Sequence, residues 1–148
     1  MILIPATPDD MELVLAWRNN PDIYKGFYTQ KKPIEWLEHF TWWFNRNKDW
    51  REFIIIEKCR KIGVVSIGQL DHWSPEIGYF IGETSLWGKG YGKQAVELTL
   101  DWLRKYGKEY CHTTVLKDNA RSLQLLKSLG FEILGEAREG EVWITKRL

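Results

Sequence analysis

The pattern of apolar positions along the chain predicts seven short strands. Residues 1–6 form an apolar run at the start, and residues 52–57, 62–69 and 76–81 form three more in the centre. Only short turns separate the central runs, which is typical of antiparallel hairpins. Residues 110–115, 131–134 and 141–144 complete the predicted strands.

Helical spacing predicts two helices between the first strand and the central strands. Thr7 can cap a helix that runs from Pro8 to about Asn19 and ends before Pro21. A second helix begins at Pro33. Its apolar stripe is predicted to comprise Ile34, Leu37, Phe40, Thr41 and Phe44.

Two further helices are expected in the second half of the chain. One spans residues 93–106, and the other begins at the potential cap Asn119, runs through Ser128 and closes at Gly130. The resulting order, βααβββαβαββ, predicts a mixed α/β (α+β) domain over residues 1–148, with one central, mostly antiparallel sheet flanked by helices. The buried stripe of the third helix is predicted to be Val96, Thr99, Leu100 and Leu103.

Charge and composition exclude several classes of protein. The 148 residues carry 21 basic and 20 acidic side chains, so the basic excess of a nucleic-acid binder is missing. No apolar run reaches the roughly 18 residues of a membrane helix, and no secretory signal is visible, so we expect a cytoplasmic protein. The two cysteines and three histidines show no metal-binding spacing, so no metal site is expected.

A glycine-rich turn between a predicted strand and a predicted helix is the first candidate for chemistry. Gly88, Gly90 and Gly92 occur at alternate positions, with Lys89 and Lys93 beside them. Free N–H groups at a helix N-terminus, together with lysine charge, favour a phosphate or pyrophosphate. The spacing fits neither a P-loop nor a dinucleotide-binding fingerprint. A tight turn without ligand is the alternative.

Two motifs in order resemble the GNAT acetyltransferases. Residues 87–92, Trp-Gly-Lys-Gly-Tyr-Gly, resemble the family's acetyl-CoA pyrophosphate loop, [Q/R]-x-x-G-x-[G/A]. Residues 119–122, Asn-Ala-Arg-Ser, followed by Leu-Gly-Phe at 129–131, resemble its second motif. The predicted element order also matches the GNAT fold along essentially the whole chain. The resemblance implies an acetyl-CoA-dependent N-acetyltransferase.

The chain departs from the family pattern at two positions. Trp87 stands where the pattern has Gln or Arg, a residue that contributes mainly through its backbone. Leu126 stands where many members have a tyrosine that protonates the leaving thiolate. Leucine cannot donate a proton, so another group, or water, must supply it, or the thiolate leaves unassisted.

The resemblance also implies which residues bind acetyl-CoA. Backbone N–H groups of the fourth strand would hold the thioester oxygen, the glycine turn would hold the pyrophosphate, and Asn119 would contact the pantetheine arm. Arg121 or Lys127 would reach the nucleotide's phosphate. The implied cofactor-binding residues are Phe80, Ile81, Gly82, Trp87, Gly88, Lys89, Gly90, Tyr91, Gly92, Lys93, Asn119, Arg121 and Ser122.

No residue stands out as the catalytic base. Glu76 is the first candidate, because it begins the fourth strand, where several family members have a water-linked carboxylate. Glu83, Asp71 and His72 are alternatives in flanking segments. Tyr79 is a candidate acid, although strand alternation also fits a packed aromatic ring.

The acceptor is inferred from the N-terminal half. Residues 17–23, 33–35 and 39–44 resemble a GNAT subgroup that acetylates nucleotide-linked amino sugars and overlaps with N-terminal acetyltransferases of ribosomal proteins. We therefore expect a primary amine of a small molecule as acceptor. A protein N-terminus is the first alternative, and a non-catalytic acyl-CoA-binding module is the second. Arg18, His39 and Trp43 are the candidate substrate contacts, and a homodimer through the last strands, near Trp143, is plausible.

Overall fold

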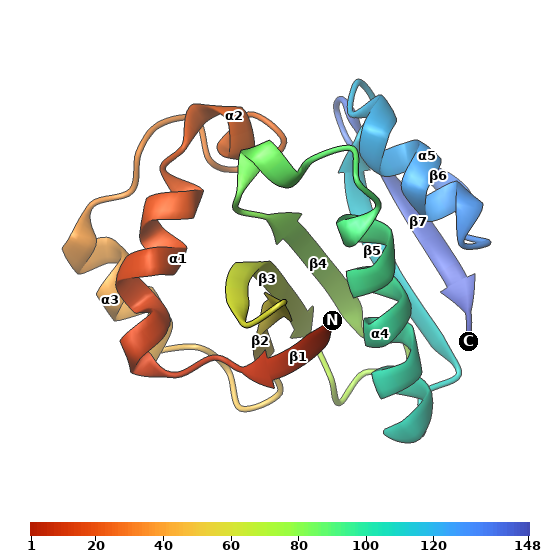
Figure 1. Ribbon diagram of the computed structural model, residues 1–148. Helices are drawn as coiled ribbons and strands as arrows, with labels where there is room; N and C mark the ends of the chain where they lie inside the picture. The colour runs from red at the N-terminus through yellow and green to blue at the C-terminus, as the bar shows by residue number, and fades with distance from the viewer.

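A single twisted sheet organises the computed structural model, which describes residues 1–148 (Figure 1). Its seven strands lie in the order β1-β2-β3-β4-β5-β7-β6, and all neighbours are antiparallel except β4 and β5. The strands are β1 Ile2–Pro5, β2 Arg51–Glu57, β3 Arg60–Gly68, β4 Glu76–Ile81, β5 Tyr110–Leu116, β6 Glu132–Arg138 and β7 Glu141–Arg147. The mixed, mostly antiparallel sheet is thereby confirmed.

Five helices and two single 3₁₀ turns flank the sheet. They are α1 Met11–Arg18, α2 Pro21–Tyr24, α3 Trp36–Phe44, α4 Tyr91–Lys105 and α5 Ala120–Ser128, with 3₁₀ turns at Pro8–Asp10 and Thr84–Leu86. The predicted order lacked α2. Asn20 accepts a hydrogen bond from the N–H of Asp22, and Pro21 occupies the first helical position, so one short turn forms after the predicted break.

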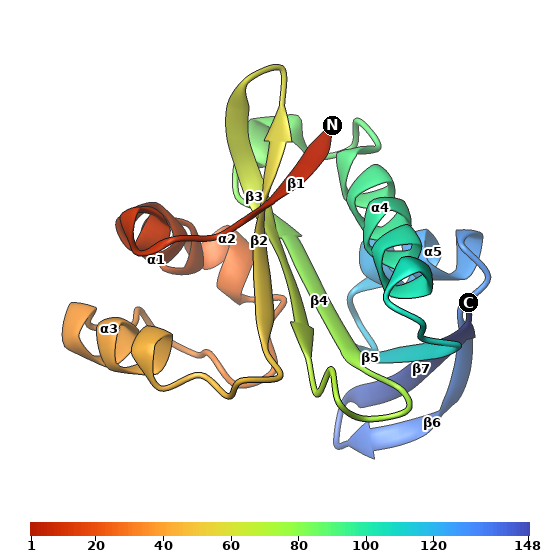
Figure 2. The ribbon, with the colours of Figure 1, turned by 90° about the horizontal axis from the view of Figure 1, so that it is seen from below.

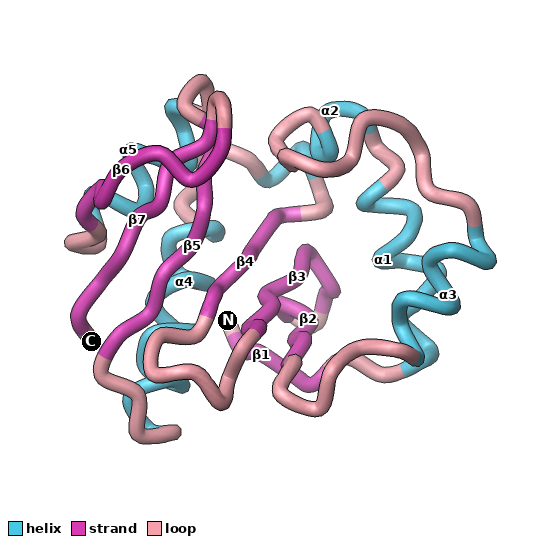
Figure 3. Tube along the Cα trace, turned by 180° about the vertical axis from the view of Figure 1, so that it is seen from behind, coloured by secondary structure: helices cyan, strands magenta, loops and turns pink.

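The helices divide between the two faces of the sheet. Figure 2 shows α4 and α5 on one face and α1, α2 and α3 on the other, beside β1 to β4. Figure 3 shows β5 and β7 with no helix in front of them on this second face. No helix therefore covers this face of the β5–β7 part of the sheet.

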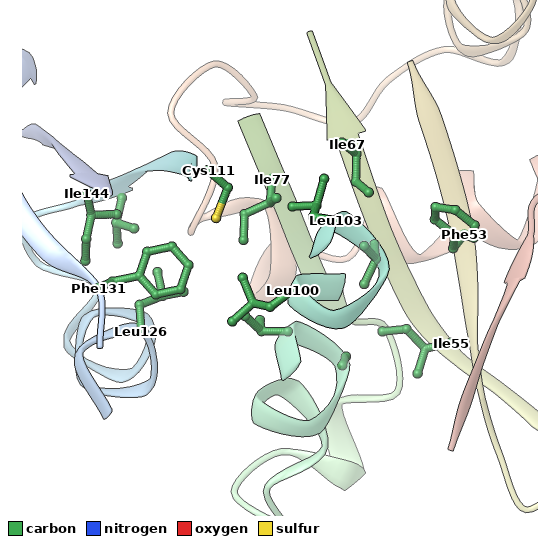
Figure 4. Packing of buried hydrophobic residues seen from close by; sticks show 14 of the residues in the cluster. Phe53, Ile55, Ile67, Ile77, Leu100, Leu103, Cys111, Leu126, Phe131 and Ile144 are labelled. Carbon is green, nitrogen blue, oxygen red and sulfur yellow. The ribbon is translucent and has the colours of Figure 1, made fainter. Parts of the chain in front are cut away.

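Two hydrophobic clusters hold these layers together. The larger lies under α4 and α5, and its core includes Ile77, Leu103 and Leu126 (Figure 4). The smaller cluster lies between helices α1 and α3 and the face of the sheet opposite α4, around Val14 and Ile54. Alternation along β2 sends neighbouring side chains into different clusters, because successive residues of a strand point to opposite faces.

Candidate active site

The glycine turn presents a row of free backbone donors at the start of α4. None of the N–H groups from Gly88 to Lys93 donates a hydrogen bond within the chain. Gly88 and Gly90 have φ of +77° and +83°, a left-handed conformation that favours glycine, and a Cβ on either would meet open space. Lys89 and Lys93 are exposed and form no ion pair. The turn fits an anionic group such as a pyrophosphate.

Strands β4 and β5 pair at one position and leave part of β4 free. The parallel register joins Glu76 to His112, with no further paired residue along β4. Opposite that edge, the N–H of Gly82 donates to the carbonyl of Ile62 at 2.8 Å. Antiparallel pairing alternates, so the N–H groups of Tyr79 and Ile81 point toward β5, beyond the paired position.

This pairing divides the predicted donors of the fourth strand between the two edges of β4. The N–H groups of Phe80 and Gly82 face β3 and belong to its ladder, whereas that of Ile81 faces the opening between β4 and β5. Position 82 requires a glycine because of packing. A Cβ there would stand 2.1 Å from the Trp17 ring, so the indole of α1 packs directly on the backbone.

Trp87 links β4, the glycine turn and α5. Its indole N–H donates to the carbonyl of Ile81 at 2.9 Å, which ties the turn to the end of β4. The Arg121 guanidinium lies over the Trp87 ring, 4.7 Å from its centre. Trp87, at the family's Gln or Arg position, therefore holds the turn against β4 through its side chain. Its ring also places Arg121 beside the turn.

The first turn of α5 meets β4 at a hydroxyl pair. The hydroxyl of Tyr79 lies 2.7 Å from that of Ser122. Burial raises the pKa of Tyr79 above its ordinary value, and the hydrogen bond to Ser122 lowers it less, so the phenol keeps its proton. Asn119 caps α5, with its side-chain oxygen accepting from the N–H of Ser122 at 3.3 Å.

Leu126 lies away from this hydroxyl pair, in the larger core. Its side chain is fully buried, among residues such as Phe131 and Ile144 (Figure 4). The position is a packing position in this chain. Tyr79 is the tyrosine whose hydroxyl approaches the first turn of α5.

The face of the sheet opposite α4 carries a contact between Ser74 and His112 that no sequence pattern predicted. Glu76 and His112 are paired on neighbouring strands, and both point to the face opposite α4, since Ile77 and Cys111 point into the α4 core. Nδ1 of His112 lies 3.1 Å from Oγ of Ser74. Ser74 and His112 are separated by 38 residues along the chain, so no local sequence pattern indicates their contact.

The segment after α2 lies beside the site. Phe27 contacts Phe80 of β4 with ring centres 5.6 Å apart. The Arg138 guanidinium, at the β6–β7 turn, stacks 3.7 Å from the centre of the Tyr28 ring. A Cβ on Gly26 would lie 3.4 Å from Nδ2 of Asn119. These contacts join the segment after α2 to β4, to the β6–β7 turn and to the N-cap of α5.

Two of the three predicted substrate contacts are buried and do not face the site. His39 is 1% exposed, and its Nε2 lies 3.0 Å from the carbonyl oxygen of Met11. Trp43 is 5% exposed and belongs to the smaller core. Both residues lie on the buried side of α3, so the structure leaves neither side chain accessible to a substrate. Arg18 packs over Trp42 at 5.0 Å, and burial lowers its pKa.

Comparisons with known proteins identify the family. The family described as "Acetyltransferase (GNAT) domain" matches residues 1–132. The chain therefore belongs to the GNAT acetyltransferases, enzymes whose acetyl donor is acetyl-CoA.

Individual relatives agree with this assignment. The chain is 44% identical over 149 residues to an uncharacterised protein of Methanocaldococcus jannaschii; the match covers 97% of this chain but spans only 30% of that protein's length. It is 27% identical over 138 residues to the acetyltransferase PseH of Campylobacter jejuni, covering 88% of this chain and 82% of PseH.

Solved structures share the fold. A domain from Methanocaldococcus jannaschii superposes with a TM-score of 0.94 at 42% identity, over 99% of this chain and 97% of that domain. The aminoglycoside acetyltransferase AAC(6')-Ib, solved in complex with coenzyme A, superposes with a TM-score of 0.85 at 16% identity, over 98% of this chain and 93% of its own. No helix of this chain is long and apolar enough to cross a membrane.

Proposed function

We propose that this chain transfers the acetyl group of acetyl-CoA to a primary amine of a small molecule, with a nucleotide-linked amino sugar as the first acceptor to test. The free N–H groups of residues 88–93, next to the unpaired edge of β4, carry the cofactor part of this proposal. The acceptor part rests on the resemblance of the N-terminal half to amino-sugar acetyltransferases and on the similarity to PseH.

The cofactor would occupy the groups that the chain leaves free. The N–H groups of residues 88–93, with Lys89 and Lys93, would hold the pyrophosphate, and Arg121 would approach the phosphate of the nucleotide. The pantetheine arm would extend along β4 and meet the N–H groups of Ile81 and Tyr79, with Asn119 on its other side. Acetyl-CoA supplies a thioester carbon activated for attack by an amine.

Residues of β4 would act on the reacting atoms. An N–H group of β4 would donate to the thioester oxygen as it gains negative charge. Glu76 would attract the ammonium group of the acceptor to the closed end of the opening between β4 and β5. When the C–N bond forms and the C–S bond breaks, the Tyr79 hydroxyl would give its proton to sulfur and regain one from solvent.

Ser122 would support this proton transfer. Its hydroxyl lies 2.7 Å from the Tyr79 hydroxyl, so it can stabilise the phenolate that forms for a moment. Tyr79→Phe removes the proton donor and keeps the packed ring. We expect this variant to lose kcat and to retain acetyl-CoA affinity.

Ligand-dependent thermal stability tests the cofactor. Acetyl-CoA and CoA at about 100 times their Kd should add roughly 2.7 kcal/mol and raise Tm by several degrees, while ATP and NAD should leave it unchanged. Thiol release is then followed with a UDP-linked amino sugar, simple primary amines and an N-terminal peptide of a ribosomal protein as acceptors.

The outcomes separate the alternatives. Fast thiol release with the amino sugar or a simple amine supports the proposal, and release with the peptide alone would assign a protein acceptor instead. Binding of CoA without turnover of any acceptor would indicate a binding module. No stabilisation by either CoA compound would contradict the cofactor assignment.

A further inference from the structure

The ring of His112 is held in a defined environment at the start of the opening between β4 and β5. On one side, Ser74 presents its hydroxyl 3.1 Å from Nδ1, and this serine is only 3% exposed. On another side, the Trp143 ring lies edge-on with its centre 5.2 Å away. The backbone N–H of His112 donates to the carbonyl of Pro75 at 3.0 Å, which joins the loop that carries Ser74 to β5.

The contact with Ser74 concerns one ring nitrogen and leaves the other free. Nε2 of His112 has no hydrogen-bond partner in the chain and is on the ring edge away from Nδ1. The hydroxyl of Ser74 has no other side-chain or backbone partner. If Nδ1 carries the proton and donates it to Ser74, then Nε2 has an unprotonated lone pair.

His112 also lies close to where the acceptor amine must react. Its register partner is Glu76, and both side chains point to the face that carries Phe80 and that no helix covers at β5 and β7. Strands rise about 3.3 Å per residue, so Tyr79, which has the first free N–H toward the opening and lies three residues beyond Glu76, is roughly 10 Å further along β4. That distance is within reach of a side chain and one bridging water.

We propose that His112 is the proton acceptor for the amine and that Ser74, whose hydroxyl is able to donate or accept, accepts from Nδ1–H and so positions the ring with Nε2 unprotonated. This inference rests on the proposed function. An acceptor amine bound as ammonium transfers one proton to Nε2, and the electron pair of that N–H bond becomes the lone pair that attacks the thioester carbon. His112 becomes an imidazolium and releases the proton to water.

The overall proton balance is complete with the residues already named. The nitrogen loses two protons, one through His112 before attack and one to solvent after the C–N bond forms. The sulfur gains one proton from Tyr79, which regains it from solvent. One proton is released for each acetyl group transferred.

The surroundings assign different roles to His112 and Glu76. Glu76 on β4 is the titratable side chain paired with His112, while the β7 partner Thr145 and the packed Trp143 carry no charge. The imidazole can take a proton at Nε2 while Nδ1–H stays bonded to Ser74, so it can pass a proton from the amine to solvent. Glu76 attracts the ammonium and stabilises the imidazolium. The role of catalytic base, for which Glu76 was the first candidate from the sequence, is therefore assigned to His112.

The first experiment reads the tautomer and needs no acceptor. The ¹⁵N chemical shifts of labelled His112 at neutral pH should show Nδ1 protonated and Nε2 free. Ser74→Ala should mix the tautomers, and Ser74→Thr, which keeps a hydroxyl, should restore the original signal. A wild-type His112 protonated at Nε2 would overturn the proposal, because that nitrogen could not accept a proton.

The second experiment separates the two residues by kinetics, using the acceptor that the wild-type chain acetylates fastest. His112→Gln should lower kcat about 10²- to 10⁴-fold and remove the acid limb of the pH profile. Glu76→Gln should mainly raise KM for the acceptor. Thr145→Val removes a hydroxyl that bonds the carbonyl of Cys111, and it serves as the control that leaves kcat unchanged.

The failures of the two proposals can be told apart. Wild-type protein that acetylates no amine contradicts the proposed function, whatever the tautomer of His112. Wild-type protein that acetylates an amine while His112→Gln retains its kcat contradicts the inference alone. The thermal shift with acetyl-CoA should be the same for wild type and His112→Gln, which checks that the variant folds and binds the cofactor.

Discussion

Helices α4 and α3 show how far a hydrophobic pattern determines which face is buried. In α4 the predicted stripe of Val96, Thr99, Leu100 and Leu103 is buried as expected, together with Ala95. In α3 the predicted stripe is largely exposed: Leu37 is 73% and Phe44 55% exposed. The buried face of α3 carries His39 and Trp43 instead.

The difference follows from the composition of the two helices. Charged and polar residues of α4 cluster on one side, so only one orientation buries apolar surface without burying charge. Residues 36–44 of α3, Trp-Leu-Glu-His-Phe-Thr-Trp-Trp-Phe, are apolar on nearly every side. Several orientations then bury similar area, and contacts with α1 select among them.

The largest effect should come from truncating the buried stripe of α4. Leu103 has no exposed surface, so Leu103→Ala should cost about 2–5 kcal/mol of unfolding free energy, through lost burial and a cavity. Leu37→Ala, on the exposed side of α3, should change it by less than about 0.5 kcal/mol. Urea unfolding of both variants measures the difference, and equal losses would show that the α3 stripe is buried in solution.

A smaller effect should separate the two ends of α4. Gly90 and Gly107 both have positive φ, so valine at either position should cost about 1–2 kcal/mol of stability. Only Gly90→Val should also weaken CoA binding, by roughly tenfold, because its side chain enters the anion-binding turn. Calorimetric titration with CoA compares the two variants, and equal affinities would place the pyrophosphate elsewhere.

The smallest expected effect is a pH dependence of the unfolding free energy that arises from His39 in α3. Burial lowers the pKa of His39, and the charges of Arg18 and Arg46 lower it further. The unfolded chain then binds a proton near pH 6.5 that the folded chain does not, so stability should fall as pH decreases through that value and be constant above it. Thermal unfolding between pH 7.5 and 5.5 measures the slope.

His39→Leu is the control for this pH effect. It removes the titrating group from a buried site among tryptophans, so its Tm should depend less on pH over the same interval. An unchanged slope in this variant would assign the pH dependence to other groups.

The elements of the proposed cofactor site were predictable from the sequence, whereas the packing around the proposed acceptor residues was not. The glycine turn, the cap Asn119 and strand β4 at residues 76–81 lie where they were predicted. These features depend on short-range rules: a left-handed turn favours glycine, and a helix N-terminus favours asparagine. The burial of His39 and Trp43, two of the predicted acceptor contacts, depends on how α3 packs, which local sequence patterns do not determine.

Tertiary structure also revised several details within the cofactor half. The indole of Trp87 bonds a carbonyl of β4, and Leu126 packs in the core while Tyr79 approaches Ser122. The glycine turn and the N-cap of α5 lie at the positions that the sequence predicted. What each side chain contacts depends on residues tens of positions away.

The sequence by itself determined the elements, the glycine turn and the family, because spacing, capping and turn preferences act over a few residues. Only the tertiary structure decided which face of α3 is buried, which N–H groups of β4 are free, and that Ser74 and His112 meet. Those outcomes depend on strand register and helix packing, where many distant contacts together select one arrangement from several of similar local energy.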